Sequence, residues 1–148
     1  MYHYRKGQKK DLTHIIELSI LWQKEDITVG YENVAWTPEK LEKKLNDYFY
    51  IVELQGMVIG YGFGEIRCGN AEPVIPQADG YLEIHEVYIH PEHRSKGVGK
   101  ELVRCLIDKA SEHQIERTLV GSSNRKWKDT ASFYEELGFR MWYIQMYK

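Results

Sequence analysis

A basic stretch with two glycines, residues 93–100 (HRSKGVGK), carries the residue types that bind phosphate. Gly97 and Gly99 stand at the start of an apolar-periodic run that predicts a helix from Val98, although glycine is a poor helix former. The free N–H groups and the dipole at a helix N-terminus attract anions, and glycine lets a bulky pyrophosphate approach the backbone. Three cations add attraction: Arg94, Lys96 and Lys100. A phosphate-binding turn and an ordinary strand–helix turn both fit these residues.

Two well-known phosphate loops do not match this stretch. A P-loop requires GxxxxGK followed by Ser or Thr, and Glu101 stands at that last position. The dinucleotide pattern GxGxxG requires a glycine where Leu102 stands. The pattern that remains is RxxGxG, formed by Arg94, Gly97 and Gly99.

Length and composition limit the number of domains and the kinds of partner that the chain can have. The chain has 148 residues, which predicts a single domain over residues 1–148. A net charge of -2 argues against a nucleic-acid partner. The sequence contains no apolar run of membrane-spanning length and no apolar signal core, so we expect a cytoplasmic protein with no membrane partner. Cys68 and Cys105 are too few for a disulfide framework.

The elements that must position the basic stretch follow from periodicity and turn residues. They predict the order β-α-α-β-β-β-α-β-α-β, an α/β fold with a mixed sheet flanked by helices. Gly60, Gly62 and Gly64 alternate, so they should clear one face of a strand rather than form a phosphate loop. The expected strands are residues 2–5, 48–54, 57–67, 81–89, 118–121 and 139–147. The expected helices begin near residue 11, at 37 (ending about 48), at 98, and at 130 (ending at 137), and residues 25–36, 68–80 and 124–129 are expected loops.

Two spaced motifs resemble those of the GNAT superfamily of N-acetyltransferases. Residues 87–99 (VYIHPEHRSKGVG) are similar to motif A, and residues 131–139 (ASFYEELGF) look like motif B. The resemblance implies that the loop binds the pyrophosphate of acetyl-CoA, that the end of the preceding strand binds the pantetheine arm and polarises the thioester carbonyl, and that Asn124 contacts the arm. The implied cofactor-binding residues are Val87, Tyr88, Ile89, Arg94, Ser95, Lys96, Gly97, Val98, Gly99, Lys100 and Asn124.

The resemblance also implies direct transfer of the acetyl group to a primary amine. Tyr134 falls on the tyrosine of motif B, the usual general acid, although its helical spacing would also fit a core residue. Glu83 and Glu86 are the first candidates for assisting amine deprotonation, with His85 third. Alternation places Glu83 and His85 on one face and Glu86 on the other, unless a bulge alters the parity. The acids could instead pair with Arg67.

The remaining expectations concern partners. Trp22, Tyr31 and Trp36 could wall the pocket of a small-molecule or peptide amine, or could be core anchors. No metal is expected, because Pro91 and the end of the strand separate the neighbouring histidines. An aromatic final strand at residues 141–147 could present an edge for a homodimer. A non-catalytic module that senses acyl-CoA is the alternative function.

Overall fold

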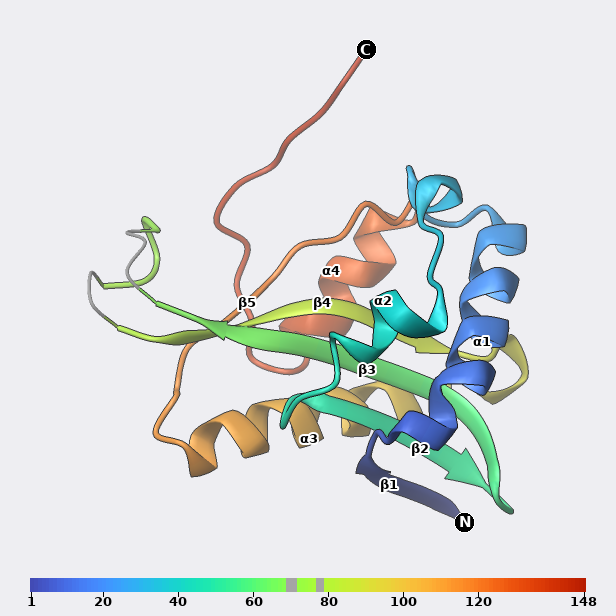
Figure 1. Ribbon diagram of the computed structural model, residues 1–148. Coiled ribbons are helices and arrows are strands. Elements are labelled where there is room, and N and C mark those ends of the chain that lie inside the picture. The colour runs from blue at the N-terminus through green and yellow to red at the C-terminus, as the bar shows by residue number, and fades with distance from the viewer. Residues whose placement is uncertain (69–71, 77–78) are drawn as a thin grey trace.

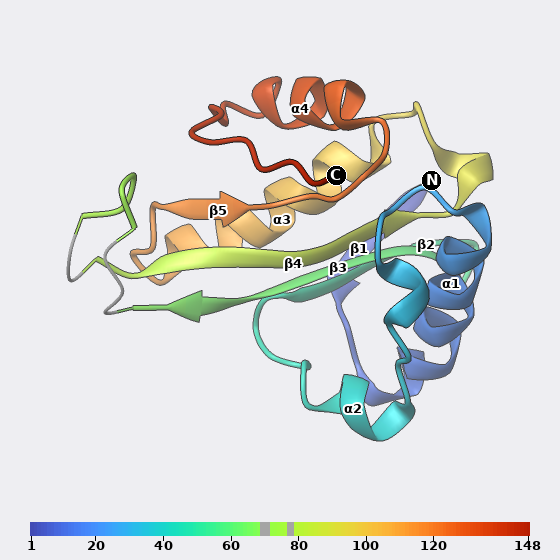
Figure 2. The same ribbon diagram turned by 90° about the horizontal axis from the view of Figure 1, so that it is seen from above.

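A computed structural model describes residues 1–68, 72–76 and 79–148. It contains one five-stranded sheet with the order β1-β2-β3-β4-β5, antiparallel except for the parallel β4–β5 pair. Helices α1 and α2 cover one face of the sheet, and α3 and α4 cover the other (Figures 1 and 2). The strands are β1 (Tyr2–Lys6), β2 (Phe49–Leu54), β3 (Met57–Arg67), β4 (Tyr81–Ile89) and β5 (Thr118–Val120). The helices are α1 (Leu12–Glu25), α2 (Pro38–Glu42), α3 (Val98–Glu112) and α4 (Trp127–Glu135), with short 3-10 turns at Lys9–Asp11, Tyr31–Asn33 and Pro91–His93.

Each face of the sheet buries its own apolar layer. On one face Ile15 of α1 packs with strand residues such as Phe49 and Tyr61, while Leu106 of α3 packs with Leu82 on the other. The expectation that alternating glycines clear one face is confirmed at Gly60, where a Cβ would meet Ile89 at the end of β4 at 2.5 Å. A Cβ at Gly62 would make ordinary contact with Leu102 of α3, at 3.4 Å.

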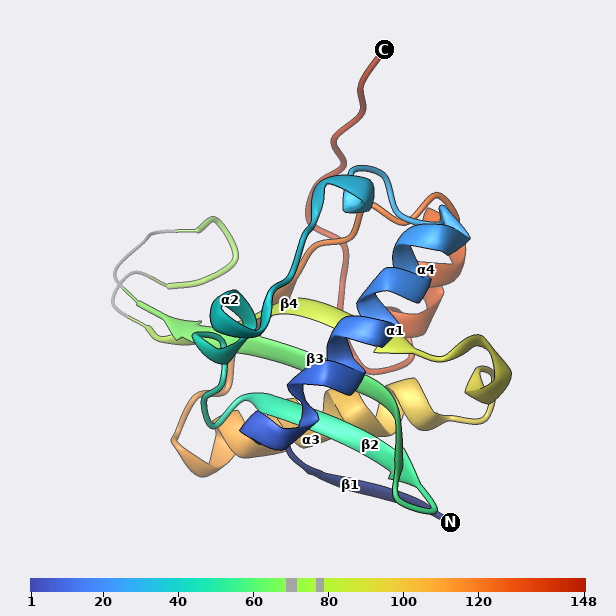
Figure 3. The same ribbon diagram turned by 45° about the vertical axis from the view of Figure 1, so that its right-hand side comes forward.

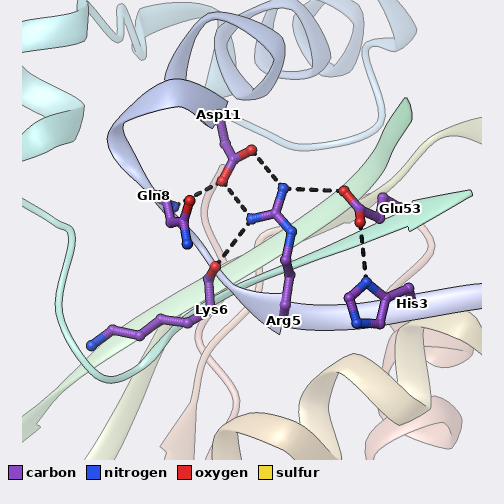
Figure 4. A network of polar contacts seen from close by, with 6 residues as sticks. All are labelled: His3, Arg5, Lys6, Gln8, Asp11 and Glu53. Carbon is purple, nitrogen blue, oxygen red and sulfur yellow. Dashed lines mark hydrogen bonds and ion pairs between the residues drawn. The ribbon is translucent and has the colours of Figure 1, made fainter. Parts of the chain in front are cut away.

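A polar network fixes the start of α1 to the edge of the sheet (Figure 4). The Arg5 guanidinium of β1 donates to both carboxylate oxygens of Asp11, at 2.8 and 2.9 Å, and to Glu53 of β2 at 3.1 Å. Asp11 also accepts from the backbone N–H of Gln8. Because Asp11 is buried, this pairing with Arg5 is required to offset the cost of desolvating the carboxylate.

Strand β4 carries a bulge at the position where function was expected. The register pairs Phe63 with Glu86 and Gly64 with Ile84, so His85 has no opposite residue on β3. A Cβ at Gly64 would lie 2.2 Å from the carbonyl oxygen of Glu83, which excludes any other residue type there without a backbone shift.

The bulge reverses the parity that simple alternation gives. His85 packs edge-on against Phe63 of the α1-side core, and Glu86 accepts a hydrogen bond from Tyr61 in the same core. Glu86 therefore lies on the same face as His85, and its expected placement on the opposite face is wrong. The result is a row of four polar side chains on the α1 face: Glu83, His85, Glu86 and Tyr88.

Two helices differ in extent from the prediction. Helix α2 ends at Glu42 rather than near residue 48, because the side chain of Asn46 accepts from the Tyr48 N–H and donates to the Gly64 carbonyl, which draws the chain into β2. Helix α4 begins at Trp127, three residues before the expected start at Thr130. None of the helices in the described ranges is long and apolar enough to cross a membrane.

The expected final strand does not form. After the Phe139 N–H bonds to the Tyr134 carbonyl, the chain has no further helix or strand and runs away from the body of the domain (Figures 1 and 3). Of the expected loop at 68–80, residues 69–71 and 77–78 lie outside the described residues.

Candidate active site

Strands β4 and β5 separate after a short parallel pairing. Their last paired residues are Ile84 and Val120, and within the described chain no strand lies against this edge of β4 beyond Ile84. Figure 2 shows the segment after β5 diverging from β4 on its way to α4. The parted strands leave a row of backbone N–H and C=O groups on β4 that an extended ligand can bind.

The alternation of β4 decides which peptide groups face this gap. The N–H of His90 donates to the Ile59 carbonyl of the neighbouring β3 chain at 2.8 Å. Groups two residues apart point the same way, so the peptide group of Tyr88 also faces β3, whereas those of Val87 and Ile89 face the gap. The resemblance implies that an N–H near Val87 or Tyr88 polarises the thioester carbonyl, and of these two Val87 is the one directed into the gap.

The start of α3 has the backbone geometry of an anion site. Gly97 is the N-cap residue with φ +80°, and no side chain in the described ranges caps this helix. Glycine is required at 97 for this left-handed backbone, rather than for space, because a Cβ there would meet nothing within 4 Å. A Cβ at Gly99 would lie 3.4 Å from the Phe133 ring of α4, which is ordinary van der Waals contact, so the packing of α4 against α3 does not itself require a glycine there.

The cations of the basic stretch are placed unequally. The Arg94 guanidinium donates twice to Glu25 at the end of α1, both at 2.8 Å, and its Nε donates to the Ile89 carbonyl at 2.9 Å. Lys100 pairs with Glu136 after α4. Lys96 is exposed. The Arg94 side chain thus ties the loop to the end of α1 and to the end of β4. The sequence pattern had suggested that it adds attraction for the phosphate.

Glu25 joins the end of α1 to β4 and to the basic stretch before α3. Its carboxylate also accepts a hydrogen bond from the Tyr88 hydroxyl, and the Arg94 guanidinium lies over the Tyr88 ring, 5.2 Å from its centroid. Burial acts to raise the pKa of Glu25, but the hydrogen bonds from Arg94 and Tyr88 outweigh it and hold the pKa below its usual range. The carboxylate therefore stays charged and holds β4, α1 and the loop together.

We expect Glu25→Gln to weaken acetyl-CoA binding several-fold while leaving kcat at saturation nearly unchanged, because it removes a charge-assisted brace but no reacting group. Since the pKa of Glu25 is lowered in the fold, its stabilising effect is present above the ordinary carboxyl pKa and is lost as pH falls through the lowered value. Calorimetric titration with acetyl-CoA measures the change. The matched control is Glu53→Gln, which alters the remote Arg5 contact at 3.1 Å and should not change the affinity.

Tyr134 belongs to α4, which lies on the α3 side of the sheet (Figure 2). It packs on the same apolar cluster as Val87 of β4 and Val120 of β5, with edge-on contacts to Phe133 and Phe139. Burial raises the pKa of Tyr134 to about 12, so the phenol keeps its proton at neutral pH.

Glu86, the other acidic candidate, accepts three hydrogen bonds from side chains. Its carboxylate accepts from the hydroxyls of Tyr31 and Tyr61, each at 2.8 Å, and from the indole N–H of Trp36 at 2.9 Å. Burial raises the pKa of Glu86 even though these donors act to lower it. Glu86 therefore holds the Tyr31–Trp36 segment onto the sheet.

Glu83 and His85 form a separate, more accessible pair. His85 Nε2 lies 3.1 Å from Glu83, and the Glu83 side chain is 33% exposed. Arg67 pairs with Glu83 at 3.1 Å and with Glu65 at 2.9 Å, as the alternative interpretation of the acids anticipated. Glu65, Glu83 and His85 are close enough together to share a cation, but Arg67 already supplies positive charge to both carboxylates.

The aromatic residues expected near the acceptor form one stacked wall. Trp22 stacks on Tyr31 at 3.8 Å and on Tyr88 at 5.1 Å, and its N–H donates to Thr28. Trp36 is joined to this wall through Glu86. The three predicted residues are thus brought together beside β4, packed as the core interpretation also predicted.

A contact that the sequence did not indicate joins the acceptor loop to the chain after β5. Val29 N–H donates to the Ser123 carbonyl at 3.0 Å, and Arg125 N–H donates to the Ile27 carbonyl at 2.8 Å. Figures 1 and 3 show these two segments side by side. Asn124 lies between those bonds, and its side-chain oxygen accepts from the Lys126 N–H. No local sequence pattern signals a pairing between segments so far apart.

Comparison with known proteins supports the motif interpretation. The sequence matches the Acetyltransferase (GNAT) family over residues 14–139. It is 28% identical over 144 residues to an N-acetyltransferase of Methanocaldococcus jannaschii, covering 93% of this chain but 60% of that protein. It is 29% identical over 148 residues to an L-amino acid N-acyltransferase of Escherichia coli, covering 91% of this chain and 77% of the relative.

The fold agrees with this match. A crystal structure of an acetyltransferase from Clostridium acetobutylicum with acetyl-CoA superposes with a TM-score of 0.73 at 17% identity, covering 99% of this chain and 96% of the other. The family match covers most of the sequence, including both motifs and the strands between them. The chain belongs to the Acetyltransferase (GNAT) family.

Proposed function

We propose that this protein transfers an acetyl group from acetyl-CoA to the primary amine of a small molecule or peptide. The observation that carries the proposal is the edge of β4 that the described strands leave unpaired beyond Ile84, to which we assign three groups. These are the gap-facing N–H of Val87, the protonated Tyr134 hydroxyl on the same apolar cluster, and the uncapped start of α3 at Gly97. The pyrophosphate would bind the α3 amides, and the pantetheine arm would extend β4 into the gap.

In the proposed reaction the amine nitrogen attacks the thioester carbonyl carbon and forms the C–N bond. The Val87 N–H stabilises the resulting oxyanion. As the intermediate collapses, the C–S bond breaks and Tyr134 donates its proton to the departing sulfur. Because burial raises the pKa of Tyr134, its hydroxyl carries a proton at neutral pH and has one to donate. The amine proton leaves to a base on the other side of the gap.

The base that the geometry supports best is the Glu83–His85 pair. If Glu83 accepts the Nε2–H of His85, the Nδ1 lone pair is free to take a proton from the amine, directly or through water. Glu86, the second carboxylate considered, has donors on both oxygens and is proposed instead to position the acceptor wall. Glu83 would therefore assist deprotonation through His85, and Glu86 would take no part in it.

Replacing His85 with Gln is expected to lower kcat/KM roughly 100-fold, the usual range for removing a general base. The loss should shrink with an acceptor whose amine is already neutral at the assay pH, because that amine needs no deprotonation before attack. Steady-state rates with acceptors of high and low basicity measure this difference. His90→Gln, a nearby histidine beyond the end of β4, is the matched control. An equal loss with both acceptors would contradict the role of base.

The function itself is tested by following free thiol release from acetyl-CoA with a panel of amines. The relative in Escherichia coli makes L-amino acids the first members of the panel, followed by aminoglycosides, polyamines and N-terminal peptides. We expect turnover with one class and mass spectrometry of the product showing one added acetyl group. Binding of acetyl-CoA without turnover on any amine would favour the alternative, a non-catalytic acyl-CoA sensor.

A further inference from the structure

A basic segment with an exposed aromatic ring leads into helix α4. Its sequence is Arg125-Lys126-Trp127-Lys128, and Trp127 is 52% exposed. Tryptophan is usually well buried, because its large ring gains much from leaving water. A tryptophan that stays exposed between cations is therefore a candidate for contact with a ligand.

The segment forms a shallow pocket of about 240 Å³, which we call the α4 pocket. Five consecutive residues line it: Arg125, Lys126, Trp127, Lys128 and Asp129. The Lys128 ammonium lies 5.5 Å from the centroid of the Trp127 ring. Because Lys128 is itself exposed, this face of the ring is reached from solvent.

The cations of the α4 pocket differ in whether they are already paired. Arg125 is bound to Asp26 at the end of α1, at 3.1 Å. Lys126 and Lys128 are exposed, and neither forms an ion pair with a carboxylate in the described part of the chain. Two ammonium groups beside an indole ring are thus available to an anionic ligand.

The α4 pocket lies toward the end of the domain where the proposed cofactor site begins. Helices α3 and α4 both start near the end of β4 and cover the same face of the sheet (Figures 1 and 2). Phe133 of α4 lies next to Gly99 in the first turn of α3. Trp127 precedes Phe133 by six residues of the same helix, which is about 9 Å along its axis. The pocket and the start of α3 are therefore joined by less than two turns of α4.

We propose that the α4 pocket binds the adenosine 3′-phosphate of CoA, with the adenine stacked on Trp127 and the 3′-phosphate bound by Lys126 and Lys128. Bases of any type stack on aromatic side chains, and ammonium groups form charge-assisted hydrogen bonds with phosphate. The long Lys128 side chain turns from the ring to the phosphate. Asp129 suits the exocyclic amine of adenine, which is a hydrogen-bond donor.

A single nucleotide matches the charge of this pocket. A phosphate monoester carries a charge of about −2 at neutral pH, which the two unpaired ammonium groups balance. A nucleic-acid strand would instead need a row of cations along its backbone. The inference rests on the proposed function, because it assigns residues to the nucleotide half of the same cosubstrate.

Calorimetric titration with three probes tests the stacking. The probes are acetyl-CoA, its 3′-dephospho form, and S-acetyl-4′-phosphopantetheine, which lacks the nucleotide. We expect the Kd of the unmodified protein to rise at each truncation. Trp127→Leu should raise the Kd for acetyl-CoA about tenfold, an effect typical of losing one stacked base, and leave the Kd for the probe without a nucleotide unchanged. Trp127→Phe keeps an aromatic face and should lose less affinity.

The double variant Lys126→Gln, Lys128→Gln tests the phosphate contact. It should bind acetyl-CoA no more tightly than it binds the 3′-dephospho form, whose Kd should stay close to that of the unmodified protein. The matched control is Lys40→Gln, Lys43→Gln, which makes the same charge change at exposed positions of α2 and should leave all three Kd values unchanged. All substituted side chains are exposed, so the variants should remain folded, as circular dichroism would verify.

Equal Kd values of the unmodified protein for acetyl-CoA and S-acetyl-4′-phosphopantetheine would overturn the assignment and leave the proposed acetyl transfer intact. An equal loss of affinity of Trp127→Leu for both probes would also overturn it, because that result indicates a distorted gap rather than a lost stacking partner. Binding of none of the three probes would contradict the proposed function itself, and the assignment with it.

Discussion

Tyr134→Phe is expected to lower kcat by about 100-fold or more, the range typical of losing a general acid, while the Kd for acetyl-CoA stays within a factor of about two. The reason is that the hydroxyl is the only group removed. The ring that packs with Phe133 and Phe139 remains, so the gap keeps its shape. Pre-steady-state thiol release measures the chemical step, and equilibrium titration measures the affinity.

The control for this change is Tyr50→Phe. Tyr50 packs on the same apolar cluster, and burial likewise raises its pKa, but it lies on β2 rather than at the β4–β5 gap. It should therefore change kcat little. If Tyr134→Phe reduced kcat and affinity equally, Tyr134 would be a packing residue, as its helical spacing alone could also mean.

The helices and strands that have clear local sequence patterns could be predicted from the sequence. Strands β3 and β4 begin and end where alternation and turn residues predicted, and α3 begins at Val98 as expected. These elements have clear periodicity and flanking glycine or proline residues. Tyr134 packs on the same cluster as Val87. The order of the two motifs implied that these residues work together, but it could not give their positions in space.

The features that the sequence did not predict depend on contacts between segments that are far apart in the chain. The bulge at His85 depends on the register of β4 with β3, and no residue within β4 itself indicates it. The pairing of Arg94 with Glu25 could not be predicted because the two residues lie 69 positions apart in the chain. The final strand was predicted from composition, but composition does not show whether a segment finds a pairing partner, and residues 139–148 form no strand.

The other large effect is expected from Gly97→Ala, which should raise the Kd for acetyl-CoA about tenfold or more and leave kcat at saturation nearly unchanged. Gly97 has φ +80°, and a left-handed backbone costs a residue with a Cβ roughly 1–2 kcal/mol. Relaxing that strain would turn the first N–H groups of α3 away from the pyrophosphate. A change of about 1.4 kcal/mol in binding corresponds to tenfold in Kd.

Gly56→Ala separates binding from stability. Gly56 has nearly the same backbone, φ +78°, and a Cβ at either glycine would meet nothing within 4 Å. Both substitutions should lower the free energy of unfolding in urea titrations, because each places a Cβ on a left-handed backbone. Only the one at 97 should weaken acetyl-CoA binding, since Gly56 lies in the β2–β3 turn. An unchanged Kd for Gly97→Ala would mean that the pyrophosphate does not bind at the start of α3.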